Sequence, residues 1–249
     1  MTLILKATVN SGENGAFVIA SADTRMVYKP FNAKTHEMRD ETLGMRNDIY
    51  DKVIPLNERV LFIGGGISSV YESFKDYLIE RAKEHYFVDD FEQIFYEAYN
   101  YFKENGNGIM KKYIDSQYVH LTILGIRKDG TPEEIRLDGN GGISKQDTRP
   151  GMTSSGMFSP SADINKKTKE LMDFENSPHW NENDIFQTYV DHLLLVHTVI
   201  ASQEVETVSD ESLIHIVHRD WNGEIKYYNG SFDLSEQIKQ IQQQYQEAT

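Results

Sequence analysis

Thr2 is the residue best placed in the chain to act in catalysis. Once Met1 is removed, Thr2 presents a hydroxyl and a free α-amine on the same residue. A hydroxyl is a weak nucleophile unless a base takes its proton, and an adjacent amine can act as that base. The ordinary pKa of an α-amine is about 7.7–8.0, which suits a general base near neutral pH. The start of the chain therefore predicts a self-contained nucleophile and base.

Composition narrows the chemistry and the partners. The 249-residue chain has a formal net charge of −14, so we expect neither nucleic acid nor an anionic membrane as a partner. It has no cysteine, which excludes disulfides and thiolate metal sites and fits a reducing cytoplasm. No apolar run or signal-peptide pattern suggests export, so we expect a soluble cytoplasmic protein. The histidines are spaced poorly for chelation, and we expect no metal and no cofactor.

The elements that must position Thr2 begin beside it. Residues 1–9 form an apolar, β-branched run that predicts a buried strand, and a turn-rich cluster joins it to a second predicted strand at 16–23. Further strands are predicted at 52–56, 58–63, 118–126, 134–137, 212–218 and 224–228. Helices are predicted at about 70–81, 89–102, 160–172, 184–201 and 235–249.

The order of these elements predicts an architecture. Strands, two helices, strands, two helices and strands are most simply packed as a four-layer α/β/β/α sandwich, with two antiparallel sheets between helix pairs. We find no internal repeat or linker and predict one α+β domain over residues 1–249. It would carry an inserted loop at about 26–51, a kind of excursion that is more often functional or mobile than inert.

Five short motifs and Thr2 carry a family resemblance. The motifs are Ala22-Asp23-Thr24-Arg25, Asp51-Lys52-Val53, Gly64-Gly65-Gly66, Ser154-Ser155-Gly156 and Glu206-Thr207-Val208-Ser209. With the order of the elements, they resemble the β-type proteasome subunits and the related bacterial protease HslV, which are N-terminal nucleophile hydrolases. The resemblance covers most of the chain in element order, but each motif is short.

The resemblance implies a catalytic group around Thr2. Thr2 would be the nucleophile, and Asp23 would pair with a buried Lys52 beneath it. A lysine kept charged in this way makes the local potential positive and assists loss of the threonine proton. Lys52 follows Asp23 by 29 residues, farther than in the proteasome subunits, which is why the loop at 26–51 reads as an insertion. Lys29, Lys34 and Arg46 remain alternatives for the lysine.

The same resemblance places an oxyanion donor and a proton relay. The backbone N–H of Gly64 would bind the oxyanion, with Gly65 as the neighbouring candidate. Ser155 would be the serine beside the threonine, although another alignment puts Met157 there. Glu206 and Ser209 match an Asp-x-x-Ser pair of the family, with glutamate in place of aspartate. A plain strand-to-helix turn at Gly64 and a polar loop at 206–209 are the alternative readings.

The resemblance implies a threonine-type peptidase or amidase that cleaves amide bonds. Its relatives form rings that take unfolded chains, so peptide or unfolded protein is the expected substrate and a homo-oligomeric ring the expected assembly. Whether a regulatory ATPase takes part does not follow from the sequence. A catalytically inactive scaffold or ring subunit of the same fold is the alternative, because Met157, Glu206 and the insertion depart from the family pattern. A small-molecule amidase of the superfamily is a third reading.

Overall fold

A computed structural model describes the fold. It covers residues 3–28, 32, 34–35, 37, 43–47, 50–116, 118–137, 142–159, 161–174, 184–204 and 207–247. These residues form an α+β structure with two antiparallel five-stranded sheets. Within them, no helix is both long and apolar enough to cross a membrane.

The first sheet is built around the start of the chain. Its strand order is β10-β1-β2-β11-β12, all antiparallel. The strands are β1 (Ile4–Asn10), β2 (Ala16–Asp23), β10 (Met152–Phe158), β11 (Glu211–Arg219) and β12 (Ile225–Asp233). Every residue of β1 and β2 is buried, as their apolar, β-branched sequences predict. The register sets Ile4 opposite Ala22 on one side and opposite Phe158 on the other.

The second sheet follows the chain order β5-β6-β7-β8-β9. Its strands are β5 (Val53–Asn57), β6 (Val60–Gly66), β7 (Val119–Ile126), β8 (Pro132–Leu137) and β9 (Ile143–Asp147). Short turns join β5 to β6 and β7 to β8, and the long connection through α1–α3 joins β6 to β7. β8 and β9 also pair antiparallel. β6 ends in the glycine run, so the run lies at the strand-to-helix junction.

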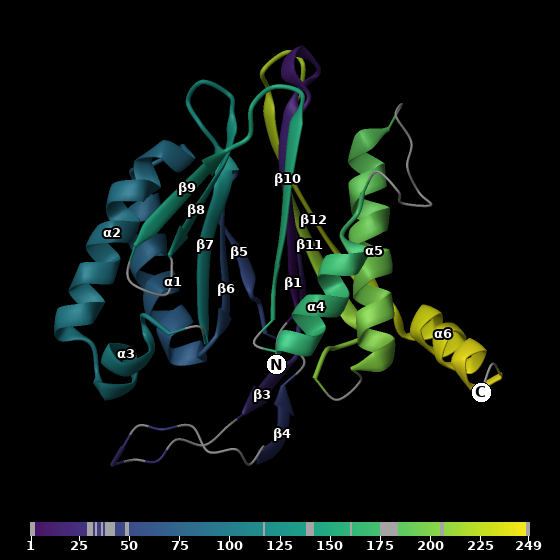
Figure 1. Ribbon diagram of the computed structural model, residues 1–249. Helices are drawn as coiled ribbons and strands as arrows, with labels where there is room; N and C mark the ends of the chain where they lie inside the picture. The colour runs from purple at the N-terminus through teal and green to yellow at the C-terminus, as the bar shows by residue number, and fades with distance from the viewer. Residues whose placement is uncertain are drawn as a thin grey trace.

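Helices lie beside each sheet (Figure 1). The helices α1 (Ser68–Ala82), α2 (Val88–Asn105) and α3 (Gly108–Tyr113) accompany the second sheet. The helices α4 (Ala162–Leu171) and α5 (Ile185–Gln203) lie against the first, and α6 (Ser235–Glu247) packs on α5 and projects from the body. Asp184 caps α5 by accepting a hydrogen bond from Gln187 N–H (3.0 Å).

Three apolar clusters hold these parts together. One joins α1 and α2 to the second sheet through residues such as Phe74, Phe95 and Leu121. Another joins α4, α5 and α6 to the first sheet. The third lies between the two sheets and includes Ile4 and Leu124, both fully buried. Alternate residues of one strand serve different clusters, because successive side chains point to opposite faces.

Several elements differ from the sequence-based expectation. Residues 143–147 and 152–158, for which no strand was predicted, form β9 and β10 at the edges of the two sheets. Every residue of these two strands is exposed or half-buried, and neither strand shows a continuous apolar pattern. The predicted insertion at 26–51 contains a small hairpin of β3 (Met26–Tyr28) and β4 (Leu43–Asn47), which projects from the body in Figure 1.

The cluster between the sheets gives a stability prediction. Leu124→Ala should lower the free energy of unfolding by about 2–5 kcal/mol, since it removes a fully buried side chain from the contact between the sheets. Urea unfolding measures the change. Ile79→Ala, on an exposed position of α1, is the control and should stay within about 0.5 kcal/mol of the wild type. Equal losses in the two variants would contradict this packing.

Candidate active site

Asp23 is the last residue of β2 and its carboxylate is buried. Its Oδ1 accepts a hydrogen bond from Leu3 N–H (2.6 Å), and its Oδ2 accepts one from Arg25 N–H (3.2 Å). The backbone returns the contact, with Asp23 N–H donating to the Leu3 carbonyl (3.1 Å). The side chain is 0% exposed, so these donors replace water around a buried charge. Asp23 therefore ties the start of β1 to the end of β2.

Lys52 brings the opposite charge to the same place. It immediately precedes β5, and its Nζ donates to Asp23 Oδ1 (2.7 Å) and to the Arg25 carbonyl (2.7 Å). The Lys52 side chain is 2% exposed. Burying an isolated ammonium at such a position would cost much solvation free energy, and the carboxylate and the carbonyl offset that cost. The structure thus brings together the two residues that the sequence suggested as a pair, across 29 positions.

Thr2 lies outside the described residues, but its neighbour in the chain does not. The peptide bond joins Thr2 to Leu3 N, the nitrogen that donates to Asp23 Oδ1. That carboxylate oxygen also accepts from Lys52 Nζ. The covalent link to Thr2 is therefore one hydrogen bond away from the buried ion pair.

Gly64 is already engaged by the backbone beside Lys52. Its N–H donates to the Lys52 carbonyl (2.9 Å), which continues the pairing of β5 with β6. A Cβ at this position would lie 1.8 Å from the ring of Tyr71, so the ring needs glycine here. This geometry goes against the expectation that the Gly64 N–H is an open oxyanion donor, because the ladder bond already uses it. Gly65, the neighbouring candidate, is the next residue of β6.

Ser209 contacts Thr24, the residue that follows Asp23. Its Oγ accepts a hydrogen bond from Thr24 N–H (3.0 Å) and lies 3.1 Å from Thr24 Oγ1. Ser209 is fully buried, and its Oγ donates to the Glu211 carbonyl (2.9 Å). The structure therefore places Ser209 against the residue that follows Asp23. Glu206, the other predicted member of this motif, lies outside the described residues.

Ser155 does not lie where the sequence placed it. The register of β10 sets Ser155 opposite Ala7 and Met157 opposite Leu5. At about 3.4 Å per residue, Ser155 lies roughly 10 Å along the sheet from the beginning of β1. Its side chain is exposed, so the predicted relay position is corrected. The reason is strand register, which the Ser-Gly motif alone could not fix.

Ser159 is the serine that the register brings toward the start of β1. It follows Phe158, the partner of Ile4, and is 2% exposed. Asn165 holds it in place, since the Ser159 N–H donates to Asn165 Oδ1 (2.8 Å) and the Ser159 carbonyl accepts from Asn165 Nδ2 (2.6 Å). The Ser159 Oγ accepts from Ser161 N–H (3.2 Å). The sequence analysis predicted a helix from about residue 160 and assigned Ser159 no role.

His197 is a second residue near the site to which the sequence analysis assigned no role. It is fully buried on α5, and its Nε2 lies 3.0 Å from the Ser209 carbonyl. The carbonyl can only accept, so Nε2 carries the proton. Burial lowers the pKa of His197 and Lys52 lowers it further, while Asp23 and the Ser209 carbonyl oppose the change. Its Nδ1 has no hydrogen-bond partner among the described residues.

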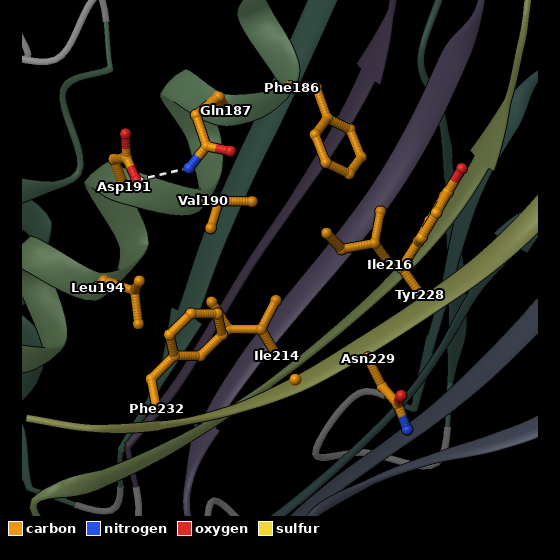
Figure 2. Close-up of a pocket in the computed structure, with 11 residues that line it drawn as sticks. Phe186, Gln187, Val190, Asp191, Leu194, Ile214, Ile216, Tyr228, Asn229 and Phe232 are labelled. Atoms are coloured by element: carbon orange, nitrogen blue, oxygen red, sulfur yellow. Dashed lines mark hydrogen bonds between the residues drawn. The ribbon is translucent and has the colours of Figure 1, made fainter.

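A groove elsewhere on the protein does not share these residues. It lies between α5 and the strands β11 and β12 and has a volume of about 290 Å³ (Figure 2). Its walls are mainly apolar, and the one carboxylate among them, Asp191, accepts a hydrogen bond from Gln187 Nε2 (2.7 Å). None of the residues around Asp23 and Lys52 lines it. It carries no nucleophile with a base, and the chemistry is better sought at the ion pair.

The described residues contain no group of three or more histidine, aspartate or glutamate side chains placed to hold a metal ion. Comparison with known proteins adds no assignment: no family model and no curated protein matches the sequence. The residues and distances around Asp23 and Lys52 therefore carry the functional argument.

The buried pair gives a second prediction. Lys52→Met should lower the free energy of unfolding by about 3–5 kcal/mol, because it leaves the Asp23 carboxylate buried without its counter-charge. The double variant Asp23→Asn with Lys52→Met should lose clearly less. Lys145→Met, which breaks the exposed pair with Glu92, should change stability by less than about 1 kcal/mol. Denaturant unfolding of the three variants compares them, and a double variant as unstable as Lys52→Met would argue against a paired charge.

The lowered pKa of His197 gives a prediction for pH. Well above pH 6.5 both folded and unfolded states hold a neutral imidazole, and the full stability is present. Below pH 6.5 the unfolded state takes up a proton that the buried His197 resists, so stability falls as pH falls toward the lowered pKa. His197→Gln should reduce this slope by up to about 1.4 kcal/mol per pH unit. Urea unfolding between pH 5 and 7.5 measures the slope.

His85→Gln is the control for that titration. His85 is partly exposed, beyond the end of α1, and lies outside the network around Ser209. The two variants should therefore differ in slope below pH 6.5 and agree above it. A His197→Gln protein with the wild-type slope would show that His197 does not resist protonation.

Proposed function

We propose that the protein is an N-terminal threonine hydrolase that cleaves amide bonds, with Thr2 as the nucleophile after removal of Met1. One observation carries the proposal: Leu3 N–H, joined covalently to Thr2, donates to a carboxylate that is itself paired with a buried ammonium. An aspartate alone at a strand end would be unremarkable. A lysine 2% exposed, held there by Asp23 and the Arg25 carbonyl, is a costly arrangement that a catalytic role explains.

The proposed reaction begins with proton transfer within Thr2. The α-amine takes the proton of the Thr2 hydroxyl, and Oγ attacks the carbonyl carbon of the substrate amide. The positive charge of Lys52 favours both loss of the hydroxyl proton and a neutral amine. Asp23 keeps the lysine in position. Backbone N–H groups beyond Gly65, at the end of β6, are the proposed donors to the oxyanion, since the Gly64 N–H already bonds to Lys52 and Gly65 lies opposite His120 in the β6–β7 ladder.

The reaction then proceeds through an ester. The bond between the carbonyl carbon and nitrogen breaks, and the α-ammonium returns its proton to the leaving amine. Water, deprotonated by the same α-amine, attacks the ester carbonyl. The carboxylic acid leaves, and the Thr2 hydroxyl is regenerated with its proton. Each proton is thus accounted for by the amine and hydroxyl of one residue.

The fold is part of the same proposal. We interpret the two sheets and their flanking helices as a four-layer α/β/β/α sandwich of the N-terminal nucleophile hydrolases. The three separate apolar clusters support this, because one lies between the sheets and one on each helix-facing side. The resemblance to β-type proteasome subunits extends the proposal to a homo-oligomeric ring in the cytoplasm that takes peptides or unfolded protein.

A non-catalytic ring subunit of the same fold is the second candidate. Two observations favour it. The predicted relay residue Ser155 is exposed, and the N–H of Gly64, the predicted oxyanion donor, is already hydrogen-bonded to Lys52. Against it stands the buried ion pair beside the link to Thr2, which a scaffold does not require.

The decisive test combines mass and activity. Intact mass of the native protein should show loss of Met1, which frees the Thr2 amine. Thr2→Ala should reduce hydrolysis of fluorogenic peptides by about 10⁴-fold, because it removes the nucleophile, while Thr2→Ser should retain measurable activity. Thr153→Ala, at an exposed threonine of β10, is the control and should retain full activity. Retention of Met1, or activity unaffected by Thr2→Ala, would favour the scaffold.

A further inference from the structure

The backbone on both sides of Lys52 is held by hydrogen bonds. The carbonyl of the preceding residue, Asp51, accepts from the hydroxyl of Tyr71 (3.0 Å). The carbonyl of Lys52 itself accepts from Gly64 N–H (2.9 Å). Both peptide groups flanking the Lys52 Cα are therefore fixed. The ammonium at the other end of the side chain is fixed by Asp23 and Arg25.

Tyr71 is built into the core so that its hydroxyl has little freedom. It is 1% exposed on the buried face of α1, and its ring stacks on Phe62 with 5.3 Å between centroids and 10° between planes. The ring of Tyr50 meets it edge-on at 5.9 Å. Burial raises the pKa of Tyr71, with the nearby carboxylates of Glu72 and Asp51 acting in the same direction. The hydroxyl is therefore protonated and serves as a donor to the Asp51 carbonyl.

Tyr71 and Gly64 form one unit. The tyrosine ring occupies the space into which a side chain at Gly64 would project, with a Cβ there only 1.8 Å from the ring. The absence of that side chain lets the ring lie against β6, where its hydroxyl reaches the residue before Lys52. The two residues whose donors fix the Lys52 backbone therefore pack against each other, ring of Tyr71 on Gly64.

We propose that Tyr71 is a positioning residue for Lys52. Through the Asp51 carbonyl it fixes the backbone from which the lysine extends, and so keeps the ammonium where it serves Thr2. The inference rests on the proposed function for its catalytic meaning. A displacement of about 1 Å in a catalytic group can cost about 10²-fold in rate, so losing one of two backbone anchors is expected to reduce turnover measurably.

Tyr71→Phe tests this with the least disturbance, because it keeps the ring against Gly64 and removes only the hydroxyl. Tyr99→Phe is the matched control. Tyr99 is also a buried tyrosine of the helices beside the second sheet, and its hydroxyl donates to Asp115 Oδ1 (2.7 Å), away from Lys52. Both variants lose one buried hydroxyl hydrogen bond, so the difference between them reports the effect specific to Lys52.

The first measurement needs no activity. Hydrogen exchange of the Gly64 amide, which bonds to the Lys52 carbonyl, should quicken by about tenfold in Tyr71→Phe and stay at the wild-type rate in Tyr99→Phe. An unchanged Gly64 amide in a folded Tyr71→Phe protein overturns the proposal. This outcome is independent of Thr2, so it is distinct from failure of the proposed function, which Thr2→Ala reports.

The second measurement is kinetic. Tyr71→Phe should lower kcat about tenfold with KM within about twofold, whereas Tyr99→Phe should change neither. The acidic limb of the kcat/KM profile should move to higher pH, because an ammonium farther from the Thr2 amine lowers the pKa of that amine less. A wild-type kcat and pH profile in Tyr71→Phe would overturn the positioning role even if the Gly64 amide exchanged faster.

Discussion

A charge pair withdrawn from water constrains this structure more than any other interaction. Asp23 and Lys52 are almost fully buried, and each is tolerable only because the other is present with hydrogen bonds around it. The hydrogen bonds around the pair fix three distant segments of backbone. Leu3 and Arg25 are held by the Asp23 carboxylate, and Arg25 also by the Lys52 ammonium. The backbone next to Lys52 is held by Tyr71 and Gly64. The two sheets are therefore joined at this point by charge as well as by apolar contact.

The space between the sheets is divided into an apolar part and a polar part. Ile4, Val18 and Leu124 belong to the apolar part. Two residues beyond Ile4 on the same face of β1, the ammonium of Lys6 pairs with Glu134 and lies 3.4 Å from Thr122 Oγ1. That hydroxyl in turn contacts His120 Nε2 (2.9 Å), whose pKa is lowered well below its usual value chiefly by burial. Polar partners on both sheets give this half a fixed register, because each group needs the one opposite.

The sequence alone was sufficient to predict the type of an element where its local apolar pattern matches its burial. β1 and β2 are buried along their whole length, and α2 and α5 show apolar residues at helical spacing, so their types could be predicted. β9 and β10 could not, because edge strands with exposed faces have no continuous apolar pattern. The position of Ser155 depended on the register of β10 with β1, which no local motif encodes. The contact of Asp23 with Lys52 was reached only by resemblance, since 29 residues and a hairpin separate them.

The glycine run shows how one local pattern can serve several tertiary needs. A Cβ at Gly64 would meet the Tyr71 ring, and one at Gly65 would lie 2.9 Å from the Phe158 ring. Gly66 has φ +96°, and a Cβ there would lie 1.7 Å from the Tyr118 carbonyl oxygen, so the entrance to α1 also needs glycine. Each glycine is thus explained by its neighbours before any catalytic use is considered. If an oxyanion forms here, its donor must come from the residues after Gly64, because Gly64 is already part of the support beneath Lys52.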